Sequence, residues 1–200
     1  MSQKVQAVED AFALLNQEMS DFRERSGLHC LLGCGRCCDK PDIEATILEF
    51  LPFAYHVFLH NEGELWLERL QQHSGSLCIL FEPNNLRGSG SCSQYPHRGL
   101  ICRLFGFSAR RNKYGAREFV GCKPIKSEMT ELYNSTVTSI AAGADVPMMS
   151  HHYMRLHAID PELTRQYYPI NDAIRRAIEI VLQYHAYSGY FDDFPEPGAA

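Results

Sequence analysis

Four of the chain's eight cysteines fall within nine residues, in the stretch Cys30-Leu-Leu-Gly-Cys34-Gly-Arg-Cys37-Cys38. Thiols two or three residues apart suit a soft metal, because a tight loop can bring successive sulfurs to one point. Two glycines in the stretch allow the chain to turn sharply there. The side chains of the adjacent pair Cys37 and Cys38 tend to diverge, so one thiol can serve one metal while the other serves a second metal or packs in the core. The stretch therefore predicts a metal-binding loop.

The other four cysteines follow singly and end well before the C-terminus. The eight candidate metal ligands are Cys30, Cys34, Cys37, Cys38, Cys78, Cys92, Cys102 and Cys122. Eight thiolates could fill two four-ligand sites, or one site with four to spare. A chain of 200 residues does not need disulfides to bury a core. We expect a cytoplasmic protein, because neither a secretory signal nor an apolar run of membrane-spanning length is found, and thiols there serve metals or redox chemistry.

Beyond the cluster, the chain resembles the YkgJ-like group of cysteine-cluster proteins, which are described as zinc- or iron-chelating. Their signature is a CxxCxxCC run followed by scattered cysteines, and here the first gap has one extra residue. The later matching segments are Leu77-Cys78-Ile79-Leu80, the stretch from Cys92 through Tyr95, Arg98 and Cys102 to Phe105, and Cys122. One departure is Gly99, where the family usually has a proline after the arginine. The resemblance spans residues 30–122 and implies that the chain binds zinc or iron.

The net charge of −5 conceals a basic segment. Residues 87–126 contain nine lysines and arginines and one acid, a charge of +8, which leaves −13 for the rest of the chain. A four-thiolate zinc site and a four-thiolate [4Fe–4S] cluster each carry a net charge of −2, so both need positive surroundings. Arg36, Arg98, Arg103 and Lys123 adjoin cysteines or lie close to them in sequence. The basic segment is therefore expected to neutralise thiolates, and the alternative is that it binds an anionic partner.

These patterns favour a metalloprotein that holds an iron–sulfur cluster and acts in redox or electron transfer with a redox or protein partner. The alternative cofactor is Zn, in a structural module that docks on a protein or nucleic acid through the basic segment. No membrane partner is expected. The spacing Cys30-x₃-Cys34-x₂-Cys37 also occurs in radical S-adenosylmethionine enzymes, but those need a large α/β barrel. A thiol enzyme would need a histidine base such as His29 or His97, so enzymatic activity stays open.

The expected fold class is α+β and α-rich, with one domain over residues 1–200. A 3.6-residue period predicts an N-terminal helix over 1–25 that ends at Gly27. We expect a cysteine-rich core with a few short strands over 26–126, C-terminal helices over 127–188 and a tail over 189–200.

Finer expectations concern single elements. Asp42 would cap a helix that starts at Ile43 and is broken or kinked by Pro52, and a short helix is expected at 64–72. Short apolar runs predict strands at 77–81 and 100–108, with a loop at 84–93 between them and a hairpin over 112–115. Asn171 would cap the last helix. His151, His152 and His157 are a candidate second metal site.

Overall fold

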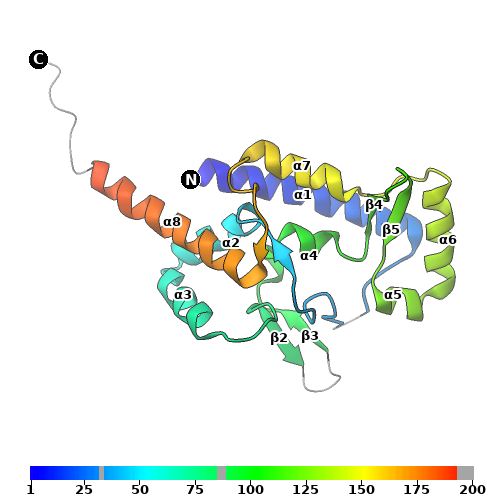
Figure 1. The fold of residues 1–200 in the computed structure, drawn as a ribbon, viewed down its shortest axis with the longest axis horizontal. Helices are drawn as coiled ribbons and strands as arrows, with labels where there is room; N and C mark the ends of the chain where they lie inside the picture. Colours follow the sequence, from blue (N-terminus) through cyan, green and yellow to red (C-terminus); the bar gives the residue numbers. More distant parts are fainter. Residues whose placement is uncertain (32–33, 85–88, 193–200) are drawn as a thin grey trace, which may run out of the picture.

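The structure is a computed structural model that describes residues 1–31, 34–84 and 89–192. It is 57% helical with a few short antiparallel strands, which confirms the predicted α-rich α+β class. Figure 1 shows two of the hairpins at different places on the molecule: β2–β3 (Phe81–Asn84 and Ser89–Cys92) lies at the bottom of the view, and β4–β5 (Ser108–Arg111 and Arg117–Val120) lies at the right, beside α6 (Thr130–Ala141). No described helix is long and apolar enough to cross a membrane. The final eight residues of the expected tail lie outside the described residues.

The N-terminal helix α1 (Ser2–Ser26) forms because its apolar side chains recur on one face. Its buried residues are Val5, Val8, Phe12, Leu15, Met19 and Phe22. Gly27 follows with φ 70°, and its N–H donates to the carbonyl of Arg23. The left-handed conformation suits glycine, so the predicted stripe and the predicted end of the helix are both confirmed.

Three helices build the core beside α1. Helix α2 (Leu51–Leu59) packs against α1 and against the long C-terminal helix α8 (Ile170–Asp192), which also contacts α3 (Gly63–Gln72). Phe53 and Trp66 meet edge to face between α2 and α3, with ring centroids 5.2 Å apart. Helix α7 (Met149–Ile159) lies along α1 on its other side (Figure 1).

The helix predicted from Ile43 is wrong. Residues Glu44–Ala45 form β1, which pairs antiparallel with β6 (Tyr168–Pro169), and a 3₁₀ turn η1 (Leu48–Phe50) leads into α2. Asp42 does not cap a helix and has φ 63°. Pro52 lies in the first turn of α2, where its missing N–H costs nothing, so it starts a helix instead of breaking one.

The middle of the chain also differs from expectation in part. Residues Phe81–Asn84 and Ser89–Cys92 form the antiparallel hairpin β2–β3, so Asn84 and Ser89–Cys92 are strand where a loop was predicted. The strand predicted at 77–81 is wrong except at Phe81, because residues 77–80 form a bend and a turn. Residues Leu100–Leu104 form helix α4, and the predicted strand there is wrong. A 3₁₀ turn η2 (Tyr95–His97) precedes α4. The predicted hairpin around 112–115 is confirmed as β4 (Ser108–Arg111) and β5 (Arg117–Val120).

Helices α5 (Lys123–Glu128) and α6 (Thr130–Ala141) connect this hairpin to α7. Helix α8 begins at Ile170, one residue before Asn171, whose side chain has another role described below. The predicted cap at this position is therefore wrong.

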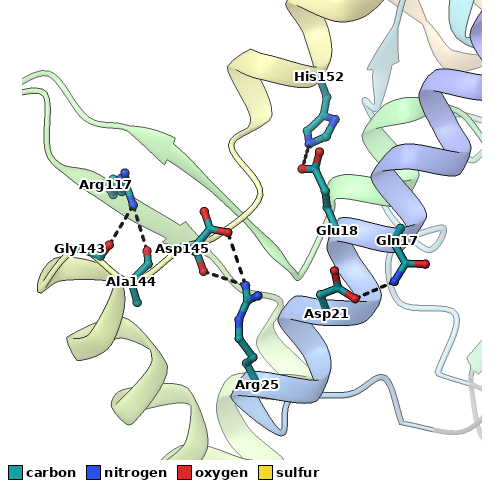
Figure 2. A network of polar contacts seen from close by, with 9 residues as sticks. All are labelled: Gln17, Glu18, Asp21, Arg25, Arg117, Gly143, Ala144, Asp145 and His152. Atoms are coloured by element: carbon teal, nitrogen blue, oxygen red, sulfur yellow. Dashed lines mark hydrogen bonds and ion pairs between the residues drawn. The ribbon is translucent and has the colours of Figure 1, made fainter.

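Charged side chains join α1 to α7 and to the connection before it (Figure 2). Glu18 approaches Nε2 of His152 at 3.1 Å and accepts a hydrogen bond from Arg155 at 2.8 Å. Burial lowers the pKa of His152, and the nearby Glu18 carboxylate opposes that shift. His157 bonds instead to the hydroxyl of Thr164. His152 and His157 thus have separate protein partners, and among the described residues the three histidines of α7 do not surround one point as metal ligands would.

Candidate metal centre

All eight cysteines are free thiols, and five separate segments carry them. The loop after α1 carries four, while the others come from the approach to β2, the end of β3, helix α4 and the residue before α5. Cys78, Cys92, Cys102 and Cys122 are partly buried and pack against the hydrophobic core. The cysteine loop lies within electrostatic reach of these downstream cysteines: Cys30 interacts with Cys122, 92 residues later in the sequence.

The cysteine loop and the β2–β3 hairpin meet at two glycines. A Cβ placed on Gly35 would lie 1.9 Å from the carbonyl oxygen of Gly90, so only glycine allows this approach. Gly35 also has φ 54°, a conformation that other residues rarely adopt. Gly90 is two residues from Cys92, so this contact holds the loop against the strand that carries a downstream thiol.

Cys38 lies at the centre of the thiol contacts. Its sulfur is 3.9 Å from that of Cys37, and its thiol is also within reach of Cys92. Hydrogen bonding to Cys37 and Cys92 raises the pKa of Cys38, and the same hydrogen bonds lower the pKa of each partner. The thiolate forms of Cys37 and Cys92 are therefore favoured beside Cys38, and a thiolate is the form of cysteine that binds a metal.

The electrostatic contacts divide the thiols into two groups. Cys30 interacts with Cys34, Cys37 and Cys122, and Cys122 in turn interacts with Cys34. In the second group, Cys102 interacts with Cys78 and Cys92, and Cys38 interacts with Cys92 and Cys102. Cys37 contacts members of both groups. Its hydrogen bond with Cys38 and its interactions with Cys92 and Cys102 connect it to the second group, and its interactions with Cys30 and Cys122 connect it to the first, so the two groups overlap at Cys37.

Burial shapes the second group most strongly. It raises the pKa of Cys78 to about 11 and also raises the pKa of Cys102. An isolated thiolate would be costly in these apolar surroundings, whereas a bound cation compensates the charge. In the described part of the chain, no three His, Cys, Asp or Glu side chains already surround one point as metal ligands would. The donor set fits zinc or iron by its chemistry, eight soft sulfurs in two groups.

Comparison with known families decides what kind of site this is. Residues 29–131, just over half of the chain, match the CxxCxxCC family, whose description reads "Putative zinc- or iron-chelating domain". The chain belongs to this family. The matched region contains all eight cysteines, so the resemblance seen in the sequence is confirmed. Neither the curated proteins nor the solved structures include a significant match.

The departure from the family pattern at Gly99 has a local reason. A Cβ at this position would lie 2.9 Å from Cζ of Phe50 and 3.2 Å from a carboxylate oxygen of Glu49. A proline ring would therefore displace Phe50, which is almost completely buried. Glycine lets the start of α4 approach η1 closely.

Two arginines of the CxxCxxCC region lie beside the thiols. The guanidinium of Arg98 stacks on Tyr95, 3.9 Å from the ring centroid. The hydrogen bond with Cys38 is the main cause that lowers the pKa of Cys37 and of Cys92, and the positive charge of Arg98 lowers both further. Arg103 is nearly buried and interacts electrostatically with Cys92 and Cys102. These contacts agree with the expected neutralising role for Arg98 and Arg103.

Arg103 also organises the segment between Cys92 and Cys102. It donates to the carbonyls of Pro96 at 2.6 Å and Arg98 at 3.0 Å, and to the side chain of Asn16 on α1 at 3.0 Å. Burial lowers the pKa of Arg103 to about 10. Arg36 is less available to thiolates, because it pairs with Asp39 at 3.3 Å.

Asn171 holds the segment around Cys78 in place. Its amide oxygen accepts from the N–H of Ile79 at 2.8 Å, and its amide nitrogen donates to the carbonyl of Leu77 at 2.9 Å. Both backbone neighbours of Cys78 are therefore fixed by one side chain from α8. Sequence reasoning assigned Asn171 to a cap, and no local pattern signals a partner more than 90 residues away.

Glu49 performs a similar role for Cys102. One of its oxygens accepts from the N–H and hydroxyl of Thr46, at 2.8 Å and 3.1 Å, and the other from the N–H of Ile101 at 3.0 Å. The Ile101 N–H is one of the unpaired donors at the start of α4, so Glu49 caps the helix that carries Cys102. The residue is fully buried. Burial raises the pKa of Glu49, and the N–H donors oppose that rise.

We expect Glu49→Gln to destabilise the protein, although the glutamine side chain has nearly the same size and shape as that of glutamate. Both carboxylate oxygens accept hydrogen bonds, so the NH₂ of glutamine must face a backbone donor in either orientation. Leaving a buried donor unpaired costs about 1–3 kcal/mol. The free energy of unfolding, measured with denaturant, should fall by this amount, while Glu44→Gln on the exposed side of β1 should leave it unchanged. Equal stability of Glu49→Gln and the wild type would contradict the capping role.

Proposed function

We propose that this CxxCxxCC protein holds iron–sulfur clusters in two four-cysteine sets and works as a redox or electron-transfer protein. The sets follow the two groups of interacting thiols. The first set is Cys30, Cys34, Cys37 and Cys122, and the second is Cys38, Cys78, Cys92 and Cys102. The observation that carries the proposal is that eight free thiols from five segments interact electrostatically with one another, enough for two sets of four, the number that a [4Fe–4S] or [2Fe–2S] cluster uses.

The surroundings of the thiols support a cluster. Three cysteines of the second set, Cys78, Cys92 and Cys102, pack against the hydrophobic core, which shields them from water. Arg98 and Arg103 supply positive charge beside the set. Backbone hydrogen bonds to Cys78 and Cys92 also favour their thiolate forms. Burial, nearby charge and hydrogen bonds to sulfur are the properties by which a protein sets the reduction potential of a cluster. A bound cluster would supply one-electron transfer.

The zinc-module alternative has less support, because much of the basic segment already has partners within the chain. Arg110 pairs with Glu118 at 2.8 Å across the β4–β5 hairpin. Arg111 donates to the carbonyl of Gly115 at 2.9 Å, and Arg117 to that of Ala144 at 3.0 Å (Figure 2). These arginines stabilise the hairpin and its contact with the α6–α7 connection. In the proposal, the protein operates in the reducing cytoplasm, and its partner is a redox protein.

Metal and sulfide analysis of anaerobically purified protein tests the proposal. We expect brown protein with a broad visible absorption that bleaches on reduction, with iron and acid-labile sulfide in equal amounts. The control is the same protein treated with a chelator before purification; this protein should be colourless. A colourless native protein with stoichiometric zinc would overturn the iron–sulfur assignment and leave the thiol sites as zinc sites.

A further inference from the structure

Three histidines meet outside the thiol sets. His56 and His60 lie one turn apart at the end of α2, and His97 comes from η2. The ring centroids of His56 and His60 are 4.3 Å apart, and those of His56 and His97 are 4.4 Å apart. None of the three was grouped by the sequence pattern, because His97 is 37 positions beyond His60 in the chain.

The hydrogen bonds of this cluster leave nitrogen lone pairs free. Nδ1 of His60 lies 2.8 Å from the carbonyl oxygen of His56. A carbonyl can only accept, so Nδ1 carries the proton and Nε2 of His60 keeps its lone pair. This is the hydrogen bond that commonly orients a histidine metal ligand through its second nitrogen. Within the described residues, the ring nitrogens of His56 and His97 make no hydrogen bond to the protein.

The cluster is also accessible. His60 is exposed, and His56 and His97 are partly exposed, so an ion can reach the rings from solvent. Imidazoles four residues apart on a helix can bind one metal together, as in zinc sites with that spacing. In the described part of the chain the rings stack and do not yet converge on one point. Rotation of partly exposed side chains is a small, fast motion, so a bound ion can reorient them.

We propose that His56, His60 and His97 form a metal site apart from the thiols, which binds a divalent transition ion such as Zn²⁺ through three imidazole nitrogens. Zinc, copper and nickel favour imidazole, and three such ligands leave a fourth position for water. The site is separate from the thiol sets and does not depend on which metal they hold. It would tie α2 to the segment that joins Cys92 to Cys102.

The test uses the full-length protein with its thiol sites already saturated. Calorimetric titration with Zn²⁺ should show one additional equivalent in the wild type. Single replacements of His56, His60 and His97 by glutamine should each lower the affinity for this additional Zn²⁺ about tenfold or more. Even the loss of a residue that only hydrogen-bonds to a ligand lowers metal affinity about 10–100-fold. In NMR spectra, Zn²⁺ should shift the signals of these three imidazoles first.

His151→Gln is the matched control, because His151 is an exposed histidine on α7 outside the cluster. It should retain the additional equivalent in full. Absence of that equivalent in the wild type, or equal weakening by His151→Gln, would overturn the site. His60→Gln changes only an exposed ring, so misfolding would not obscure the result. The readout is a difference from thiol-saturated protein, so failure of the iron–sulfur proposal would leave it intact.

Discussion

Replacing Cys34 by serine should remove the first cluster and leave the second, while Cys78→Ser should do the reverse. A serine hydroxyl is a poor ligand for soft metals, so a set with three thiols loses its cluster. We expect each variant to retain about half of the wild-type iron and sulfide, and the double variant to retain none. A structural metal site can contribute on the order of 10 kcal/mol to folding, so the melting temperature should also fall sharply.

Cys34→Ala and Cys78→Ala are the controls for the introduced hydroxyl, and both should match their serine counterparts. Two results would contradict the proposal in different ways. If Cys34→Ser kept all of its metal and an unchanged melting temperature, the loop would not be a ligand segment. If either variant alone lost all of its iron, the eight thiols would serve one shared centre and the division into two sets would be wrong.

Candidate ligands could be identified from the sequence, but the contacts among them could not. Four cysteines within nine residues are a local pattern, and a local pattern can be recognised without knowledge of the fold. The neighbours of each thiol depend on tertiary contacts such as that between Gly35 and Gly90. Similarly, the backbones beside Cys78 and Cys102 are held by two side chains distant in sequence, Asn171 and Glu49.

The same distinction separates the correct elements from the wrong ones. Helix α1 was predictable because 25 residues repeat one periodic stripe. The run at 100–104 is too short for its period to distinguish a helix from a strand. Its helical state is stabilised by Glu49, about fifty positions earlier, which accepts the N–H of Ile101. Pro52 was ambiguous in the same way, since a proline both breaks helices and starts them.

A single methyl group on Gly35 should separate the cysteine loop from the hairpin. In Gly35→Ala the new Cβ would lie 1.9 Å from the carbonyl oxygen of Gly90, and the atoms that it meets all belong to the backbone of Gly90. No side-chain rotation can relieve such a clash, so the loop must move away from β3 and Cys92. We expect loss of metal from both sets, because Cys37 and Cys38 follow directly, together with a stability loss of about 3–5 kcal/mol from the clash and the strained backbone.

Gly143→Ala isolates the backbone contribution to this effect. Gly143 has φ 102°, and a Cβ there would meet nothing within 4 Å, whereas Gly35 combines positive φ with a blocked approach. The control should therefore lose only about 1–2 kcal/mol, the cost of a left-handed conformation for alanine, and keep its full metal content. Equal melting temperatures and metal contents for the two variants would show that the loop does not depend on contact with Gly90. A larger loss in Gly35→Ala alone would mean that the metal sites require the close backbone approach to Gly90 that glycine permits at position 35.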